Sequence, residues 1–426
     1  MQTAFSASTE HILVHLFGQI AVILGTSRII GSIFNRFGQS RSVGEIISGV
    51  LLGPSLFGLL APEAFSFIFK PAGPAILPWF SHMGLVLALF IIGMEFDFRS
   101  VMPDLKKVVV VSLATLIAPV ILGFVIGPWL WSFAPGEGSR NAYYLFLGMT
   151  MAITAIPIMG RILMERDLTE TRVGVLSITT GALKDVLTWF LLVVVIGVAR
   201  PPIDPFKLAK MISLSAALAI ISLTFGRRLI YKFQDQWGWE KDGLPSGAMI
   251  AFLLISLMLM SAATAWIGIF AIFGAFLAGV TVSSDRRLSE AVSDRFHDLT
   301  IYLFLPIFFT YTGLRCDLST LSGYGWIAII VVTIAGSAGS GGVAWAIARL
   351  KGLEGREALA FGALINTPGL MVLIILNIGL DLEIVPLELF SILVASAMIR
   401  NLIVTPIISK SLKAPFAASS WGASAG

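Results

Sequence analysis

The chain is poor in charged side chains, which make up only 13% of its 426 residues. A soluble domain carries about 25%, so the composition argues against a water-soluble protein. The single cysteine, Cys316, excludes a disulfide framework within the chain. The first ten residues hold no basic side chain, which argues against a cleavable signal peptide. The net charge of +4 requires no nucleic-acid partner.

Histidine is also scarce, with four in the whole chain. His11 and His15 are spaced as two ligands on one helix face would be, but this spacing alone is weak evidence for a metal. We therefore predict neither a resident metal nor a cofactor. The sequence shows no pairing of a nucleophile with a base of the kind that would indicate an enzyme.

Apolar residues are abundant: 57% of the chain is hydrophobic and the mean hydropathy is +0.91. About 20 apolar residues span a bilayer as a helix, so we expect an all-α polytopic membrane protein with about thirteen spans. The longest polar loop is expected near 227–246. The predicted spans are 11–34, 42–60, 78–96, 107–133, 142–163, 173–199, 207–226, 247–264, 266–283, 296–314, 325–348, 356–379 and 386–408.

The lysines and arginines are distributed unevenly over the predicted loops. With the N-terminus outside, most of the 29 basic residues fall in loops that face the cytoplasm. This bias follows the positive-inside rule. It predicts an external N-terminus and a cytoplasmic C-terminus.

Thirteen spans divide as six, one and six. The seventh span makes the second six start from the opposite side of the membrane, which predicts two inverted six-helix repeats. The fifth span of the first half contains "TAIP" (154–157), and the fifth span of the second half contains "NTPG" (366–369). Proline interrupts the backbone hydrogen bonds of a helix. Ordinary proline kinks would leave the same trace, but the symmetric placement favours paired broken helices, which point to a transporter's binding site.

Two adjacent charges lie deep in the span 173–199. Asp185 is about twelve residues from either end, and an ionisable group at that depth is a functional hypothesis by default. Its neighbour Lys184 points about 100° away on a helix, so the two do not face each other. Burial disfavours the charged form of a carboxyl group. Asp185 could therefore hold either a proton or a bare monovalent cation, with carbonyls freed at the breaks and the Thr154 and Thr367 hydroxyls as further ligands.

Six segments in order along the chain resemble the monovalent cation:proton antiporter family, in the branch of bacterial sodium or potassium:proton antiporters and plant cation/proton exchangers. One of these matches alone would be weak, whereas six in order are specific. They are "VGEIISGVLLGPSLFG" (43–58), "GMEFDF" (93–98), "TAIPIMGRILMERDLTETRVG" (154–174), "FGAFLAGV" (273–280), "LPIFF" (305–309) and "REALAFGALINTPGLMVLIILNIGLDL" (356–382).

The resemblance implies a homodimer whose mobile core shuttles past a dimer scaffold in an elevator-like cycle. It also implies residence in a bilayer, here the inner (plasma) membrane of a bacterium, and no nucleotide-binding regulatory domain in this chain. The implied parts are scaffold helices in 1–96 and 247–314, core helices in 107–199 and 325–408, a linker helix at 207–226 and a cytoplasmic tail at 409–426.

By the resemblance, the family's ion-binding aspartate falls on Asp185. Electrogenic relatives often carry a lysine where this chain has Ser340, and many members carry an arginine where it has Pro368. Here the extra cation is Lys184, which we interpret as a transplanted charge. It would donate to Ser340 or to carbonyls freed at Pro157 or Pro368, or stand in for the missing arginine.

The expected ion- and proton-binding residues are Asp185, Thr154 and Thr367, and the residues expected to tune the site are Lys184, Pro157, Asn366, Pro368 and Ser340. One titratable carboxylate predicts electroneutral exchange of sodium or potassium for protons. Two alternatives stay open. Lys184 could have changed the cargo to protonated amines or an anion, or the chain could be a transport-dead sensor that keeps the fold.

Overall fold

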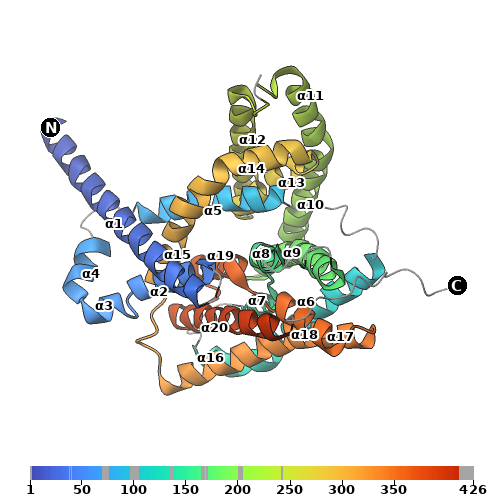
Figure 1. The fold of residues 1–426 in the computed structure, drawn as a ribbon. Helices are drawn as coiled ribbons and strands as arrows, with labels where there is room; N and C mark the ends of the chain where they lie inside the picture. The colour runs from blue at the N-terminus through green and yellow to red at the C-terminus, as the bar shows by residue number, and fades with distance from the viewer. Residues whose placement is uncertain are drawn as a thin grey trace. The chain divides into compact units, whose positions relative to one another are not determined.

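The computed structural model describes residues 2–37, 39, 41–69, 76–95, 105–133, 139–164, 168, 171–199, 205–240 and 243–411. Every regular element within these ranges is a helix, apart from one isolated bridge between Trp239 and Pro245. The expected all-α class is therefore confirmed for the described residues (Figure 1). The tail from 412 onward and the end of "GMEFDF" lie outside them.

Ten helical segments in the described ranges are long and apolar enough to cross a membrane. They coincide with ten of the predicted spans. The other three predicted spans, 142–163, 266–283 and 296–314, correspond to helices that are interrupted or shorter. The count of thirteen stays a prediction.

The predicted polar loop at 227–246 is wrong in its first part. Residues 227–237 form α11, which follows α10 through η3. α11 has one polar face and buries Ile230 on the other, so its composition resembles that of a loop. The predicted span 42–60 coincides with the candidate span Val43–Leu60, within which α2 ends at Leu52 before a Gly-Pro pair that disfavours helix.

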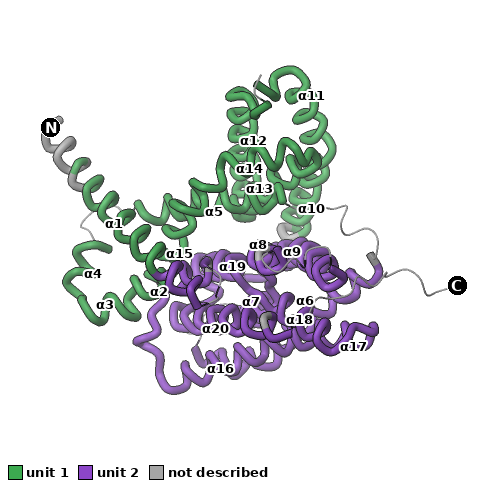
Figure 2. The backbone as a smooth tube through the Cα atoms, viewed as in Figure 1, with its two compact units in different colours: residues 1–29, 48–97, 202–314 green, residues 30–47, 98–201, 315–426 purple. Residues whose placement is uncertain are grey.

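The chain forms two compact units (Figure 2). Unit 1 comprises residues 1–29, 48–97 and 202–314, and unit 2 comprises residues 30–47, 98–201 and 315–426. Helices α1 (Gln2–Arg36) and α2 (Arg41–Leu52) have residues in both.

Unit 1 is assembled around close contacts between apolar helices. A side chain at Gly93 of α5 would strike the Phe276 carbonyl of α13, and one at Gly279 would strike the Phe90 carbonyl. Small residues let membrane helices approach this closely. The helices of this unit are α3 (Phe57–Leu60), α4 (Pro62–Phe69), α5 (Leu77–Met94), α10 (Pro205–Ile221), η3 (Ser222–Gly226), α11 (Arg227–Trp237), α12 (Gly247–Ile267), α13 (Ala271–Val282), α14 (Arg286–Leu299), η4 (Thr300–Phe304) and α15 (Leu305–Leu314).

Unit 2 contains both proline motifs and both central charges. Its helix α18 begins with a capping box in which Glu354 and Glu357 satisfy the free backbone donors of the first turn. The helices of this unit are α6 (Leu105–Leu130), η2 (Trp131–Phe133), α7 (Arg140–Ala152), α8 (Ile156–Met164), α9 (Arg172–Ala199), α16 (Gly323–Gly336), η5 (Ser337–Gly342), α17 (Val343–Leu350), α18 (Gly355–Ile365), α19 (Gly369–Asp381) and α20 (Leu387–Ser411).

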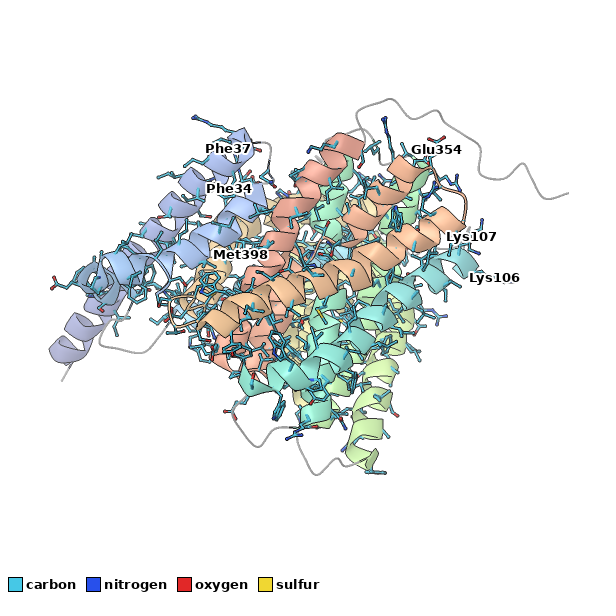
Figure 3. All side chains as sticks on the ribbon, turned by 90° about the horizontal axis from the view of Figure 1, so that it is seen from below. Phe34, Phe37, Lys106, Lys107, Glu354 and Met398 are labelled. Atoms are coloured by element: carbon cyan, nitrogen blue, oxygen red, sulfur yellow. The ribbon has the colours of Figure 1, made fainter. Side chains whose placement is uncertain are left out.

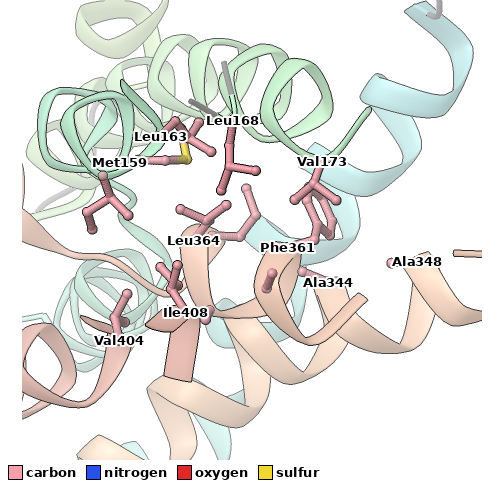
Figure 4. Close-up of a cluster of buried hydrophobic side chains, with 14 of the residues drawn as sticks. Met159, Leu163, Leu168, Val173, Ala344, Ala348, Phe361, Leu364, Val404 and Ile408 are labelled. Carbon is pink, nitrogen blue, oxygen red and sulfur yellow. The ribbon is translucent and has the colours of Figure 1, made fainter. Parts of the chain in front are cut away.

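A buried apolar cluster joins helices from both halves of unit 2 (Figure 4). Met159 and Leu163 of α8 pack in it with Phe361 and Leu364 of α18, and Val404 of α20 belongs to the same cluster. These contacts hold one half-helix from each proline motif in a fixed place.

Charged residues at the start of α6 and α18 lie at one end of unit 2. Figure 3 shows Lys106 and Lys107 at the same end as Glu354. The first turns of these two helices therefore lie on one side of unit 2.

Candidate functional site

Both proline motifs interrupt their helices. α7 ends at Ala152, residues 153–155 are not helical, and α8 starts at Ile156. In the second motif α18 ends at Ile365 and α19 starts at Gly369, with Pro368 as its N-cap. Pro157 likewise stands in the first turn of α8, where a missing backbone donor costs little. Each proline thus begins the second half of a broken helix.

The two breaks contact each other. The backbone N–H of Ala155 donates to the carbonyl of Thr367 over 2.6 Å. Gly369 has a φ of +54°, and a Cβ at this position would overlap the Cβ of Ala155. Glycine is therefore needed at 369 both for the backbone conformation and for the close approach.

The break of α18 frees the carbonyl of Ile365, and two hydroxyls converge on it. Thr154 Oγ1 donates to this carbonyl over 2.7 Å, and Ser340 Oγ of η5 donates to it over 3.2 Å. Thr154 and Ser340 are fully buried. The polar group exposed by the break is thus satisfied within the protein, as burial in a membrane requires.

Lys184 reaches the same two hydroxyls from α9. Its ammonium donates to Ser340 Oγ over 2.8 Å and to Thr154 Oγ1 over 3.0 Å. The side chain is fully buried. The transplanted-charge interpretation includes Ser340 among the possible acceptors, and Lys184 donates to it. The other acceptor of Lys184 is the Thr154 hydroxyl rather than a carbonyl freed at Pro157 or Pro368.

Asp185 is 3% exposed and lies on α9 beside this group. It is not a hydrogen-bond partner of Lys184, as the angle between neighbouring helix positions predicts. Glu45 of α2 is the other buried carboxylate of the described residues. Of these two carboxylates, only Asp185 adjoins the lysine that Thr154 and Ser340 hold.

Arg400 of α20 is a site residue that the sequence analysis did not single out. It is 2% exposed, and its Nε and Nη2 both donate to Asn366 Oδ1, over 2.9 and 2.7 Å. A Cβ at Gly336 would meet its Nη1 at 2.9 Å. The guanidinium therefore occupies space that only glycine leaves open at 336, and it places a positive charge against Asn366, two residues before Pro368.

Asn366 and Asn401 complete the support of the second break. Asn366 donates from Nδ2 to Ser337 Oγ over 3.1 Å. Asn401 Oδ1 accepts from the backbone N–H of Gly369 over 3.2 Å. Adjacent residues of α20, Arg400 and Asn401, thus hold the two sides of one break.

The remaining predicted residues are placed as follows. Thr367 lies in the second break and is 1% exposed, and its hydroxyl donates to the Ala363 carbonyl of α18 over 3.3 Å. The side chain of Pro157 lies outside the described residues. On α9, the hydroxyls of Ser177, Thr180 and Thr188 are buried and have no hydrogen-bond partner among the described residues. A polar seam therefore continues along α9 beyond Lys184.

An integral membrane helix bundle with two broken helices that meet beside a buried carboxylate has the construction of a secondary transporter. The chain belongs to the family described as "Sodium/hydrogen exchanger, transmembrane", which it matches over residues 21–413. This is a family of ion antiporters rather than enzymes. The resemblance inferred from the six motifs is confirmed.

Several named relatives are similar along most of this chain. A Na(+)/H(+) antiporter, NhaS4 of Synechocystis sp., is 34% identical over 95% of this chain and 98% of its own length. Cation/H(+) antiporter 20 of Arabidopsis thaliana is 30% identical over 92% of this chain, and K(+)/H(+) antiporter 1 of Saccharomyces cerevisiae is 29% identical over 94%. The chain spans about half the length of these plant and yeast relatives, 48% and 46%.

A solved structure shares the fold. The sodium proton antiporter MjNhaP1 from Methanocaldococcus jannaschii superposes with a TM-score of 0.63, covering 93% of this chain and 95% of its own. The sequence identity is 15%, so this likeness concerns the fold alone.

Proposed function

We propose that the protein exchanges a monovalent cation, sodium or potassium, for protons, and that Asp185 carries both. The observation that carries the proposal is the position of this buried carboxylate, next to a lysine held by Thr154 of the first break and by Ser340 of η5. Relatives named as Na(+)/H(+) and K(+)/H(+) antiporters support the class of cargo.

The two ligands exclude each other at one carboxyl group. The protonated acid releases its proton on one side, and the carboxylate then takes up the cation, with Thr154 and Thr367 as proposed further ligands. Lys184 donates to Thr154 in the present arrangement, so this hydroxyl becomes a cation ligand only if the ammonium moves.

Exchange by this scheme is electroneutral. A protonated Asp185 and a cation-loaded Asp185 carboxylate carry the same net charge, and Lys184 and Arg400 stay in place. A membrane potential imposed on vesicles should therefore neither drive nor bias the exchange. A clear voltage dependence would indicate that Lys184 releases its proton during the cycle.

We assign the moving core to unit 2 and the dimer scaffold to unit 1, in an elevator-like cycle. The support is that both breaks and both central charges belong to unit 2, and that unit 1 is separately compact. The proposed setting is a bacterial inner membrane, with the N-terminus outside and the C-terminus in the cytoplasm. A cyanobacterial relative supports this setting.

Reconstituted vesicles test the proposal. Asp185→Asn should lower cation-driven proton flux to the level of empty vesicles, measured with a trapped pH dye against Na⁺, K⁺, Li⁺ and Rb⁺. The exposed carboxylate of Asp235 on α11 gives the matched control, and Asp235→Asn should exchange at the wild-type rate. Wild-type flux in Asp185→Asn would refute the assignment.

Two other functions remain distinguishable in the same assay. Flux driven by alkylammonium ions and not by alkali cations would favour the changed cargo. A folded wild-type protein without flux for either would favour a sensor.

A further inference from the structure

The hydroxyl oxygens of Thr154 and Ser340 can bind the Lys184 ammonium only as hydrogen-bond acceptors. A hydroxyl has one hydrogen, and a backbone carbonyl can only accept. Both hydrogens are directed at the Ile365 carbonyl. The lone pairs of both oxygens are therefore directed at the Lys184 ammonium, which can only donate.

This arrangement is a built receptor for a positive charge. Two buried oxygens present lone pairs at 2.8 and 3.0 Å from one nitrogen, and the carbonyl behind them belongs to the last residue of α18. The C-terminal end of a helix carries partial negative charge, which favours a cation nearby. No carboxylate takes part, so the receptor suits a single positive charge.

The receptor shares Thr154 with the proposed transport site but does not use the Asp185 carboxylate, because Lys184 and Asp185 point in different directions from α9. We propose that Thr154 Oγ1 and Ser340 Oγ form a second site for a small monovalent cation, which the Lys184 ammonium fills as a tethered occupant. When the tether is cut away, the site accepts a free cation of the same class, with ammonium as the best geometric match. This goes beyond the proposed antiport.

Lys184→Ala and Lys184→Met both remove the ammonium, and they differ in whether the space beside Thr154 and Ser340 stays open. Alanine removes the ammonium and leaves the room it occupied, whereas methionine fills most of that room with an apolar chain and leaves no space for an ion. Both variants carry Asp185→Asn, so that the carboxylate of the proposed transport site cannot contribute to cation binding. Failure of antiport and failure of this inference are then distinguishable.

The experiment measures thermal unfolding of the purified protein in ammonium chloride, with choline chloride keeping the ionic strength constant. Lys184→Ala/Asp185→Asn should show a saturable rise in Tm, roughly 1–2 °C at a tenfold excess over the dissociation constant. Lys184→Met/Asp185→Asn and Asp185→Asn alone should show no rise. Adding Ser340→Ala to the alanine variant should abolish the response, because one of the two acceptors is gone.

If the alanine variant unfolds without added cation, its folding yield becomes the measurement. Purification in ammonium chloride should then recover a single peak in size-exclusion chromatography, and purification in choline chloride should not. Equal Tm or equal yield in the two salts would overturn the proposal. An equal response of the alanine and methionine variants would also overturn it.

Discussion

Arg400 is a buried cation whose described partner is an uncharged amide, and this makes a sharp prediction about stability. Both of its hydrogen bonds end on Asn366 Oδ1. Asn366→Leu would leave the guanidinium buried without this acceptor, which costs about 3–5 kcal/mol. Arg400→Met would instead remove the charge and leave one amide oxygen unsatisfied, at a cost of about 1–3 kcal/mol.

The double variant Asn366→Leu/Arg400→Met distinguishes two causes of instability: a buried guanidinium without an acceptor, and the mere loss of packing contacts. Replacing both partners of a buried polar pair by apolar groups of similar size can be nearly neutral. Adding Arg400→Met to Asn366→Leu should therefore raise stability again, although it is a second core substitution. The bond from Asn366 to Ser337 is lost in both proteins and cancels in the comparison.

Thermal unfolding in detergent, followed by the fluorescence of the ten tryptophans, is a suitable assay. The single variant Asn366→Leu should lower Tm by roughly 3–6 °C. Arg286→Met is the control, because the Arg286–Glu290 pair is exposed and should contribute little. A double variant as unstable as Asn366→Leu, or less stable, would refute the reasoning.

Two further predictions concern single residues. Gly369→Ala should lower Tm far more than Gly352→Ala. Both glycines have positive φ, but of the two only Gly369 stands where a Cβ would overlap another residue. Equal losses of Tm would contradict the close contact between the two helix breaks. Burial raises the pKa of the Cys316 thiol to about 12, so at pH 8 the thiol stays protonated. N-ethylmaleimide should then label Cys316 only after unfolding in dodecyl sulfate, as read by mass spectrometry, and rapid labelling of the folded protein would show that the thiol is accessible.

The features that sequence predicted well are those with a local cause. Both breaks could be located from "TAIP" and "NTPG", in which a proline and polar groups stand together inside an apolar run. Proline alone was not enough, because Pro119 and Pro128 lie inside α6 and Pro406 lies inside α20. The contact of Lys184 with Ser340 was predicted because the charge missing on one helix had appeared on another. That inference needed the resemblance to a family and not the residues alone.

The features that sequence missed depend on tertiary contacts. Arg400 reads as one more basic residue of the last span, and its partner Asn366 lies 34 residues earlier. The pair Arg400-Asn401 inside an apolar helix was the available signal. Helix α11 was missed for the opposite reason, because a helix with one polar face has the composition of a loop.

The long sequence separation within the site has a consequence for synthesis of the protein in the cell. Ser340, an acceptor of the Lys184 ammonium, lies 156 residues downstream of it. At a synthesis rate of about 5–20 residues per second, roughly 8–30 s pass between the two. During that interval α9 holds two ionisable groups that cost about 2.5–3.5 kcal/mol each at the centre of a membrane helix, and its lysine lacks this acceptor. Complete pairing of the Lys184 ammonium in α9 therefore waits until η5 has been made, so a buried contact of the first half of the protein is completed only by the second half.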